Sequence, residues 1–254
     1  MLHKLGKLPA RPGAISFKFS KYFKVAALPT PPAVFGHQAL VSAYGVLGND
    51  QYGDCVLAGG DHEEMLWNAE AGVAVAFTDA NALSDYTALT GFNPADPATD
   101  QGTDMQAAAS YRRTTGLIDA NGVRHKVDAY VAPAVGDVNE LMAATYLFGA
   151  VGFGFQFPAS AMTQFNAGQP WSVVPGSPIE GGHYCPCVGR AASGNLVVVT
   201  WGALQEMTPE FAATFNDESV CYLSLEALKN SISPENFDLA TLQADLNALP
   251  VQGS

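Results

Sequence analysis

The sequence is poor in charged residues and cysteine, and it lacks long apolar runs. Only 14% of its 254 residues are Asp, Glu, Lys or Arg, whereas 48% are hydrophobic. That apolar content is enough for one large domain or for two lobes that share an interface. No stretch approaches the roughly 20 uncharged apolar residues that span a bilayer, so we expect no membrane partner. No period repeats, which excludes a solenoid.

The N-terminus lacks an apolar core followed by a small-residue cleavage site, and the sequence therefore predicts no secretory signal. A cytoplasmic or virion-associated protein is expected. The chain has four cysteines, and it is far larger than the small scaffolds that depend on disulfides. We expect these thiols to be reduced. They are Cys55, Cys185, Cys187 and Cys221.

Acidic residues are missing from the first 49 positions, although the net charge of the chain is −12. Half of the 12 basic residues lie in that stretch: Lys4, Lys7, Arg11, Lys18, Lys21 and Lys24. Residues 1–30, rich in proline, are expected to form a basic extended arm. Because the rest of the chain supplies the countercharge, we expect the arm to dock there rather than on nucleic acid. An acidic partner protein or a frayed terminus are the alternatives.

Helical patterns dominate the first half of the chain. Asp54 is a good N-cap for a helix from Cys55 to about Gly72, and further helices are predicted over 78–92, 104–116 and 137–149. The stretch "DHEEM" at 61–65 is typical of a solvated helix face. A loop is predicted over 93–104 from its Pro, Gly, Asn and Asp content.

Strand patterns dominate the second half, over 123–133, 150–158, 182–190, 195–202 and 219–228. Helices followed by strands predict an α+β fold with two lobes. We expect a helical lobe at 31–118, which carries the candidate nucleophile, and a strand-rich lobe at 119–254. Within these bounds, residues 31–225 would form one domain that is followed by a C-terminal tail.

Cys55 is a candidate nucleophile because it follows Gly-Asp at the predicted start of a helix. Unpaired backbone N–H groups and the helix dipole stabilise a thiolate there and lower the thiol pKa. Such a nucleophile needs an imidazole within hydrogen-bond reach. Among the five histidines, His183 stands apart because it follows Gly181–Gly182 and opens an apolar strand, whereas His62 and His125 are flanked by charged residues.

The order of these parts resembles the papain-like cysteine peptidases over roughly residues 30–225. "NDQYGDC" keeps a glycine two residues before the cysteine, "GGHYCPCVG" matches the strand that the family histidine opens, and "VVVTWG" keeps a Trp-Gly pair. The resemblance is to a divergent intracellular member of bacterial or phage type. It implies a helical N-terminal lobe, an antiparallel barrel-like C-terminal lobe, and a peptide or protein substrate. It implies no cofactor or metal, and it leaves the oligomeric state open.

The resemblance also implies the site residues. Cys55 would attack, His183 would act as base and then acid, and Trp201 would shield the pair from water. Asn49 stands where the family has its oxyanion-hole glutamine, and Gln51 could compete for that role. Gln101 and Gly102 would border the cleft and bind peptide backbone, and Gly182 would let a ligand approach closely.

The departure from the family lies at the residue that orients the imidazole. The family's asparagine aligns with Val199, which cannot hydrogen-bond. Thr200 is the nearest polar substitute, provided that the strand end twists, and Gln205 is a looser candidate. Because the orienting residue only holds the ring, this change predicts slower turnover rather than none.

Other interpretations remain open at each of these positions. Cys55 could be a small buried helix residue, and His183 a satisfied core histidine. His183, Cys185 and Cys187 share one strand face, but a structural zinc site usually takes four ligands from turns. For the whole chain, a papain-like scaffold with little turnover, acting as a docking component of a larger assembly such as a virus, is the main alternative. Acyl transfer by the same thiol is another.

Overall fold

We describe a computed structural model of the chain, which covers residues 3–11, 13, 15, 18–22 and 30–224. The C-terminal tail that was expected after residue 225 lies outside the described residues. Seven α-helices and nine strands lie within them: α1 (Phe19–Tyr22), β1 (Phe35–Gly36), α2 (Cys55–Glu70), α3 (Asp79–Thr90), α4 (Met105–Thr114), β2 (Leu117–Ile118), β3 (Arg124–His125), β4 (Val127–Val131), α5 (Val138–Phe148), β5 (Val151–Pro158), α6 (Ala159–Asn166), β6 (Ile179–Arg190), β7 (Leu196–Thr200), β8 (Ala203–Met207), α7 (Pro209–Phe215) and β9 (Asn216–Ser224).

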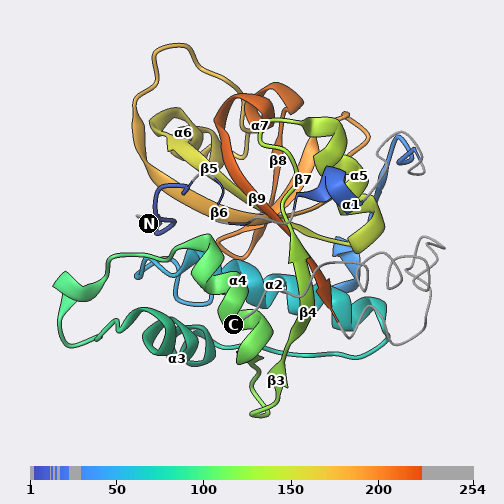
Figure 1. Cartoon of the computed structure of the whole chain (residues 1–254). Helices are drawn as coiled ribbons and strands as arrows, with labels where there is room; N and C mark the ends of the chain where they lie inside the picture. The colour runs from blue at the N-terminus through green and yellow to red at the C-terminus, as the bar shows by residue number, and fades with distance from the viewer. Residues whose placement is uncertain (1–2, 12, 14, 16–17, 23–29, 225–254) are drawn as a thin grey trace.

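The strand-rich part is one antiparallel sheet with the strand order β4-β9-β5-β6-β7-β8. The short strand β1 pairs with β6, so a segment that precedes the helical part also joins this sheet. Figure 1 shows the sheet together with α5, α6 and α7 in the upper part of the molecule, and α2, α3 and α4 in the lower part. The fold is α+β, as the sequence predicts.

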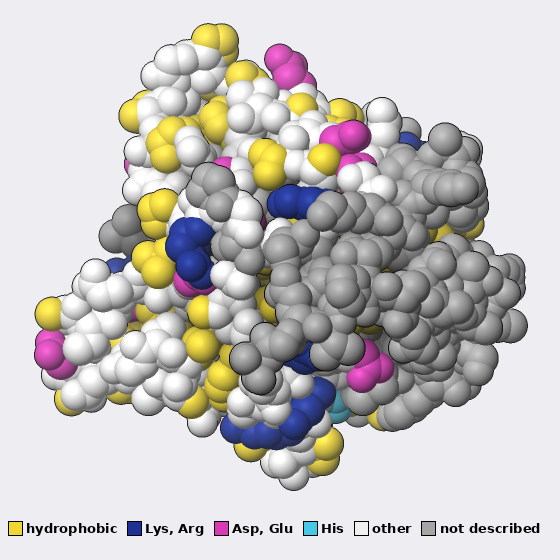
Figure 2. All heavy atoms as spheres, viewed as in Figure 1, with side chains coloured by type: hydrophobic (Ala, Val, Ile, Leu, Met, Phe, Trp, Pro, Cys, Tyr) yellow, Lys and Arg dark blue, Asp and Glu magenta, His cyan; other side chains and the backbone are white. Residues whose placement is uncertain are grey.

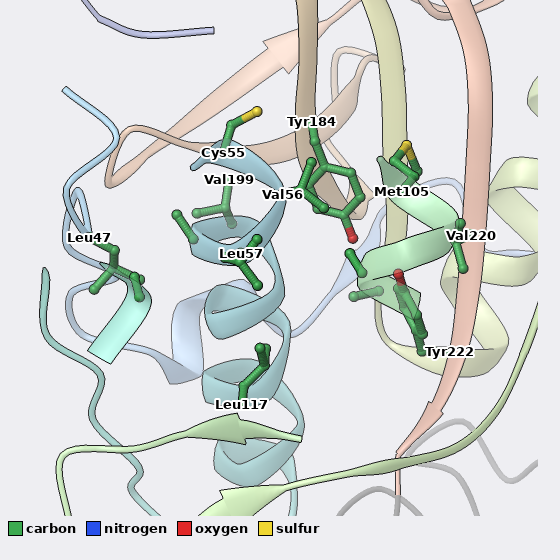
Figure 3. Close-up of a cluster of buried hydrophobic side chains, with 14 of the residues drawn as sticks. Leu47, Cys55, Val56, Leu57, Met105, Leu117, Tyr184, Val199, Val220 and Tyr222 are labelled. Carbon is green, nitrogen blue, oxygen red and sulfur yellow. The ribbon is translucent and has the colours of Figure 1, made fainter. Parts of the chain in front are cut away.

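Each face of the sheet packs against a different set of helices. Side chains alternate between the two faces of a strand: Tyr184 of β6 joins the cluster that contains Val56 and Leu57 of α2, whereas Cys185 joins the cluster that contains Leu147 of α5. Figure 3 shows Tyr184 beside Val56 and Cys55 at the start of α2. The sheet face toward α2 therefore joins the two parts of the molecule.

Two elements differ locally from their predictions. Phe19–Tyr22 form a helical turn inside the arm that was expected to be extended. The strand expected at 123–133 is divided into β3 and β4, and β3 pairs with β2 as a separate hairpin. Figure 2 shows Lys and Arg side chains gathered over this hairpin, where Arg124 and Lys126 are exposed. His125 between them is buried and lies 3.3 Å from an Asp119 carboxylate oxygen.

None of the helices in the described part of the chain is long and apolar enough to cross a membrane.

Candidate active site

Cys55 is the first residue of α2, and its side chain is buried. Asp54 occupies the N-cap position, as predicted, but its carboxylate does not cap the helix by a hydrogen bond. The Cys55 sulfur instead interacts with the backbone of Tyr184 in β6 and of Gly6 in the arm. Figure 3 shows the sulfur directed beyond the N-terminal end of α2. The helix start therefore presents the thiol to β6 and to the N-terminal arm.

His183 lies on β6 next to Tyr184 and is completely buried. Its Nε2 is 2.8 Å from the hydroxyl oxygen of Thr200 at the end of β7. Its Nδ1 has no hydrogen-bond partner among the residues that the structure describes, and that includes Cys55. The thiol and the imidazole thus both border Tyr184, but no hydrogen bond joins them in this state.

The contact between Thr200 and His183 depends on a sharp turn after β7. Trp201 follows Thr200 with a φ of 48°, a left-handed conformation that is uncommon for a bulky residue. The turn places the indole of Trp201 on the imidazole of His183, with ring centroids 4.5 Å apart and planes 21° apart. Gln205, the other candidate orienting residue, donates instead to the carbonyls of Gln169 and Glu206.

The protonation states differ from those expected for an active pair. Burial raises the pKa of the Cys55 thiol to about 12, although the helix start was predicted to lower it. Burial, together with the neighbouring His3, lowers the pKa of His183 to about 3. Both groups are therefore neutral at pH 7. Because the arm covers the site, desolvation outweighs the helix dipole.

A short stretch of the N-terminal arm, residues 3–8, covers the site; we call it the arm segment. The N–H groups of Gly6 and Lys7 both donate to the carbonyl of Gly182, at 3.2 and 3.1 Å. On the opposite side, Thr103 donates to the Gly6 carbonyl at 2.7 Å, and Leu8 donates to the Thr103 carbonyl at 3.0 Å. The arm segment is thus held by its backbone between the two parts of the chain. In Figure 1 it is the dark blue stretch near the N label.

The N-terminal end of the arm segment covers the indole of Trp201. The imidazole of His3 stacks on Trp201 with centroids 4.6 Å apart, and Trp201 Nε1 donates to the carbonyl of Lys4 at 3.3 Å. Trp201 is therefore sandwiched between His183 and His3 and is only 5% exposed. The shielding that was expected of Trp201 is seen in its geometry, and the arm segment adds a second layer.

Charge also holds the arm on the body. Lys7 pairs with Asp217 at 3.0 Å, and Arg11 pairs with Asp104 at 2.6 Å. The hydrogen bond from Arg11 lowers the pKa of Asp104. The expected docking of basic arm residues on the chain's own acidic residues is seen at these two positions.

The candidate substrate-binding residues divide into two groups. Gly102 and Gly182 contact the arm segment closely: a Cβ on Gly102 would overlap the Gly6 carbonyl, and one on Gly182 would overlap the Lys7 carbonyl. Gln101 and Gln51 are exposed, and the Gln101 amide donates to the Ala98 carbonyl at 2.6 Å. Only the two glycines are brought to the arm.

Asn49 is not aimed at the thiol in this structure. Its Nδ2 donates to the carbonyl of Tyr52 at 3.0 Å, within the turn that leads to Cys55. Its backbone carbonyl accepts from Lys4 at 3.0 Å. In this state Asn49 holds the turn and the arm segment together.

The charged face predicted on α2 is wrong, because "DHEE" is buried. Arg112 of α4 pairs with Glu63 and also with Glu64 at 3.0 Å, and Tyr184 donates to Glu63 at 2.8 Å. These ion pairs and the hydrogen bond join α2, α4 and the sheet. Within the described part of the chain, no cluster of three or more His, Cys, Asp or Glu residues is arranged to hold a metal ion.

Sequence reasoning missed two residues of the site, Thr103 and Lys7. Thr103 follows the predicted Gln101–Gly102 pair by one position and makes the backbone contacts that were expected of that pair. Lys7 was counted only as one charge of the arm, yet its side chain is fully buried. The missed signal was the glycine beside Lys7. Only glycine fits at position 6, because a Cβ there would overlap the carbonyl of Gly53.

Comparisons with known proteins identify the fold. No family model and no curated protein sequence matches the chain. Among solved structures, it is similar to xylellain, a cysteine protease from Xylella fastidiosa, with a TM-score of 0.65 and 14% identity over 88% of this chain and 97% of that one. It is similar to proCathepsin B S9 from Trypanosoma congolense, with a TM-score of 0.56 and 10% identity over 87% and 86%.

A third similar structure is the ragweed pollen cysteine protease Amb a 11 in its proform. Its TM-score is 0.55, with 15% identity over 79% of this chain and 69% of that one. The chain therefore has the papain-like fold that its motifs resemble.

Proposed function

We propose that the chain is a papain-like thiol hydrolase, specifically a cysteine peptidase that cleaves peptide bonds through a thioester. The observation that carries this proposal is the arm segment, an extended polypeptide held by backbone hydrogen bonds to Gly182 and Thr103 with Gly6 beside the Cys55 sulfur. A strip that binds a peptide backbone next to a thiol is what a peptidase requires. The proforms among the similar structures also support it.

In the proposed reaction, His183 Nδ1 takes the thiol proton and the Cys55 sulfur attacks the substrate carbonyl carbon. The tetrahedral intermediate collapses, the C–N bond breaks, and the amine leaves with the proton from the imidazolium. Water, deprotonated by the same nitrogen, then attacks the thioester. The products are a carboxylic acid and the restored thiol.

Three groups support this chemistry. His183 Nε2 lies 2.8 Å from the Thr200 hydroxyl, and in the tautomer that donates to this oxygen the Nδ1 lone pair is free to take the proton. The N–H of Cys55, at the first helical position, has no intrahelical acceptor and is an oxyanion donor. Asn49 becomes the second donor only when its Nδ2 leaves the carbonyl of Tyr52.

The arm segment itself is not placed for attack. The Gly6 carbonyl oxygen accepts from Thr103 and the Gly6 N–H donates to Gly182, so both polar backbone groups of Gly6 are engaged away from an oxyanion site at Cys55. A substrate must displace the arm segment, and water then reaches the thiol and the imidazole. We expect rehydration to lower the thiol pKa and raise the imidazole pKa toward an ion pair.

The second candidate function is a papain-like scaffold with little turnover that serves as a docking component. The neutral thiol and imidazole, and the absence of a hydrogen bond between these two described residues, favour it.

An activity-based thiol probe separates the two functions. A peptidyl chloromethyl ketone, from which the Cys55 sulfur displaces chloride, should label Cys55 in the folded full chain at neutral pH, and His183→Gln should abolish the labelling while the protein stays folded by circular dichroism. Cys185 and Cys221, buried in the sheet, are internal controls. Labelling of Cys55 no faster than that of these two thiols would favour the scaffold. Comparing peptide hydrolysis with amine incorporation then distinguishes peptidase from acyl-transfer activity.

A further inference from the structure

Lys7 is a lysine whose side chain is fully buried in a pocket of the body. Its ammonium nitrogen lies 3.0 Å from a carboxylate oxygen of Asp217 and 3.9 Å from one of Glu218. It also donates to the carbonyl of Leu8 at 3.0 Å. Burying an ammonium group costs free energy unless the group is paired and hydrogen-bonded. Asp217, Glu218 and the Leu8 carbonyl are these partners of Lys7.

The walls of the pocket are shaped for an unbranched side chain. Gly154 of β5 lies beside the Lys7 methylenes, and a Cβ there would overlap both Lys7 and the Met105 sulfur. Asn216 fixes the start of β9 by donating to the Gly154 carbonyl at 2.8 Å and accepting from Gly136 at 2.9 Å. The two carboxylates that follow Asn216 therefore have a fixed position at the end of the pocket.

Arg11 also acts electrostatically on Glu218, but it forms its ion pair with Asp104. Among the described residues, Lys7 is the only cation within ion-pair distance of Asp217 or Glu218. Their side chains are 17% and 13% exposed, and burial raises the pKa of the Glu218 carboxyl while Lys7 opposes that shift. An open pocket would present two adjacent negative charges, which attract a cation.

The pocket is one residue away from the thiol. Gly6 lies against the Cys55 sulfur, and Lys7 is its neighbour in the chain; both donate to the Gly182 carbonyl. Any peptide that binds along the same strip would place a side chain here.

We propose that this pocket, formed by Met105, Gly154, Asp217 and Glu218, selects a lysine or arginine side chain of the substrate next to the residue at Cys55. Lys7 occupies the pocket in the resting molecule in place of that substrate side chain. This inference rests on the proposed peptidase function, which supplies the substrate.

The first test compares two peptidyl chloromethyl ketones on the full chain. In each probe a glycine carries the reactive carbon, from which the Cys55 sulfur displaces chloride, and the residue before that glycine is either lysine or norleucine. These side chains have the same carbon length and differ by the ammonium group. The lysine probe should label Cys55 at least about tenfold faster, the equivalent of one removed charge-assisted contact of about 1.4 kcal/mol. Asp217→Asn/Glu218→Gln should bring the ratio of the two rates close to one.

Equal labelling by the two probes in the wild-type chain would overturn the selectivity and leave the peptidase function standing. Labelling by neither probe, in the wild type or in a Gly6→Ala variant that displaces the arm segment, would instead overturn the peptidase function.

The second test needs no chemistry at Cys55. In the full-chain variant Lys7→Ala, n-butylammonium should raise the melting temperature more than n-butanol does, because it restores the missing side chain with its charge. The matched control is Lys4→Ala, whose side chain is exposed and should show no such gain. Equal stabilisation by the neutral alcohol would contradict a pocket that selects charge. If Lys7→Ala does not fold, the labelling comparison decides alone.

Discussion

At the scale of single residues, the hydroxyl of Thr200 takes the place of the asparagine side chain expected beside His183, and the turn of the backbone makes this possible. Val199, at the position of the family's asparagine, is buried and cannot hydrogen-bond. The adjacent Thr200 reaches His183 because the chain turns sharply at Trp201. The sequence predicted this contact only on the condition that the end of the strand twists. It could not predict the neutral states of Cys55 and His183, because they depend on the path of the arm segment.

The hydroxyl of Thr200 should orient the imidazole. Thr200→Val removes the hydrogen bond while preserving the shape of the side chain, and we expect kcat to fall about fivefold, in keeping with a neutral hydrogen bond of about 1 kcal/mol. Loss of this partner destabilises the imidazolium. The alkaline limb of the pH profile, which reports loss of the imidazolium proton, should therefore move to lower pH. KM should change little.

Thr200→Ser is the matched control, because it keeps the hydroxyl. It should restore most of kcat and the pH profile. A Thr200→Val enzyme with wild-type kcat would show that Thr200 only packs against the ring.

At the scale of elements, α2 carries both the thiol and a buried charge network. Gly59 lets the helix lie against the ring of Tyr184, where a Cβ would overlap. One turn further on, Glu63 and Glu64 meet Arg112, whose guanidinium also lies 4.0 Å from the ring centroid of Tyr222. The network fixes α2 between α4 and the sheet and so sets the direction of the thiol.

Removing the cation of this network should be strongly destabilising. Arg112→Ala leaves two buried carboxylates without their partner, and we expect a loss of about 3–5 kcal/mol in the free energy of unfolding by urea. Arg112→Lys should recover only part of this loss, because one ammonium cannot bridge both carboxylates as a guanidinium does.

The neighbouring Arg113 is exposed and offers the matched control. Arg113→Ala should change stability by no more than about 0.5 kcal/mol. Similar effects of the two substitutions would argue against a stabilising role for the network.

Strong local patterns predicted most elements, and weak ones were missed. The expected helix at 55–72 is α2, and the expected strands at 150–158 and 182–190 are β5 and most of β6. The eight-residue α6, the seven-residue α7 and the edge strand β8 were missed, since segments this short carry little periodic signal and depend on packing. The burial of "DHEE" was also missed, because its partner Arg112 lies on another helix.

At the scale of the whole molecule, the N-terminal arm and the body act as one unit. The order of motifs in the sequence was enough to predict the fold, and the charge asymmetry predicted that the arm docks on the body. Neither feature indicated where it docks. That position depends on tight backbone contacts, such as Gly6 against Gly53 and Gly102, which no pattern along the chain specifies.

Displacing the arm segment should expose the thiol. A Cβ in Gly6→Ala would overlap the Gly53 carbonyl, and overpacking of this kind costs about 1–3 kcal/mol. We therefore expect alkylation of Cys55 by iodoacetamide at pH 7.5 to become about tenfold faster or more, as followed by mass spectrometry.

Lys4→Ala is the control within the arm segment, because the Lys4 side chain is exposed. It should leave the alkylation rate unchanged. An unchanged rate in Gly6→Ala would mean that the arm segment does not limit access to the sulfur.

The hydrogen bonds of residues 4–8 join parts of a single polypeptide, and this has a consequence for inhibition. A tethered occupant meets its binding strip at an effective concentration in the millimolar range, whatever the amount of protein in solution. Dilution alone should therefore not release it, and an untethered competitor must either exceed that local concentration or bind more tightly than Gly6 and Lys7 do.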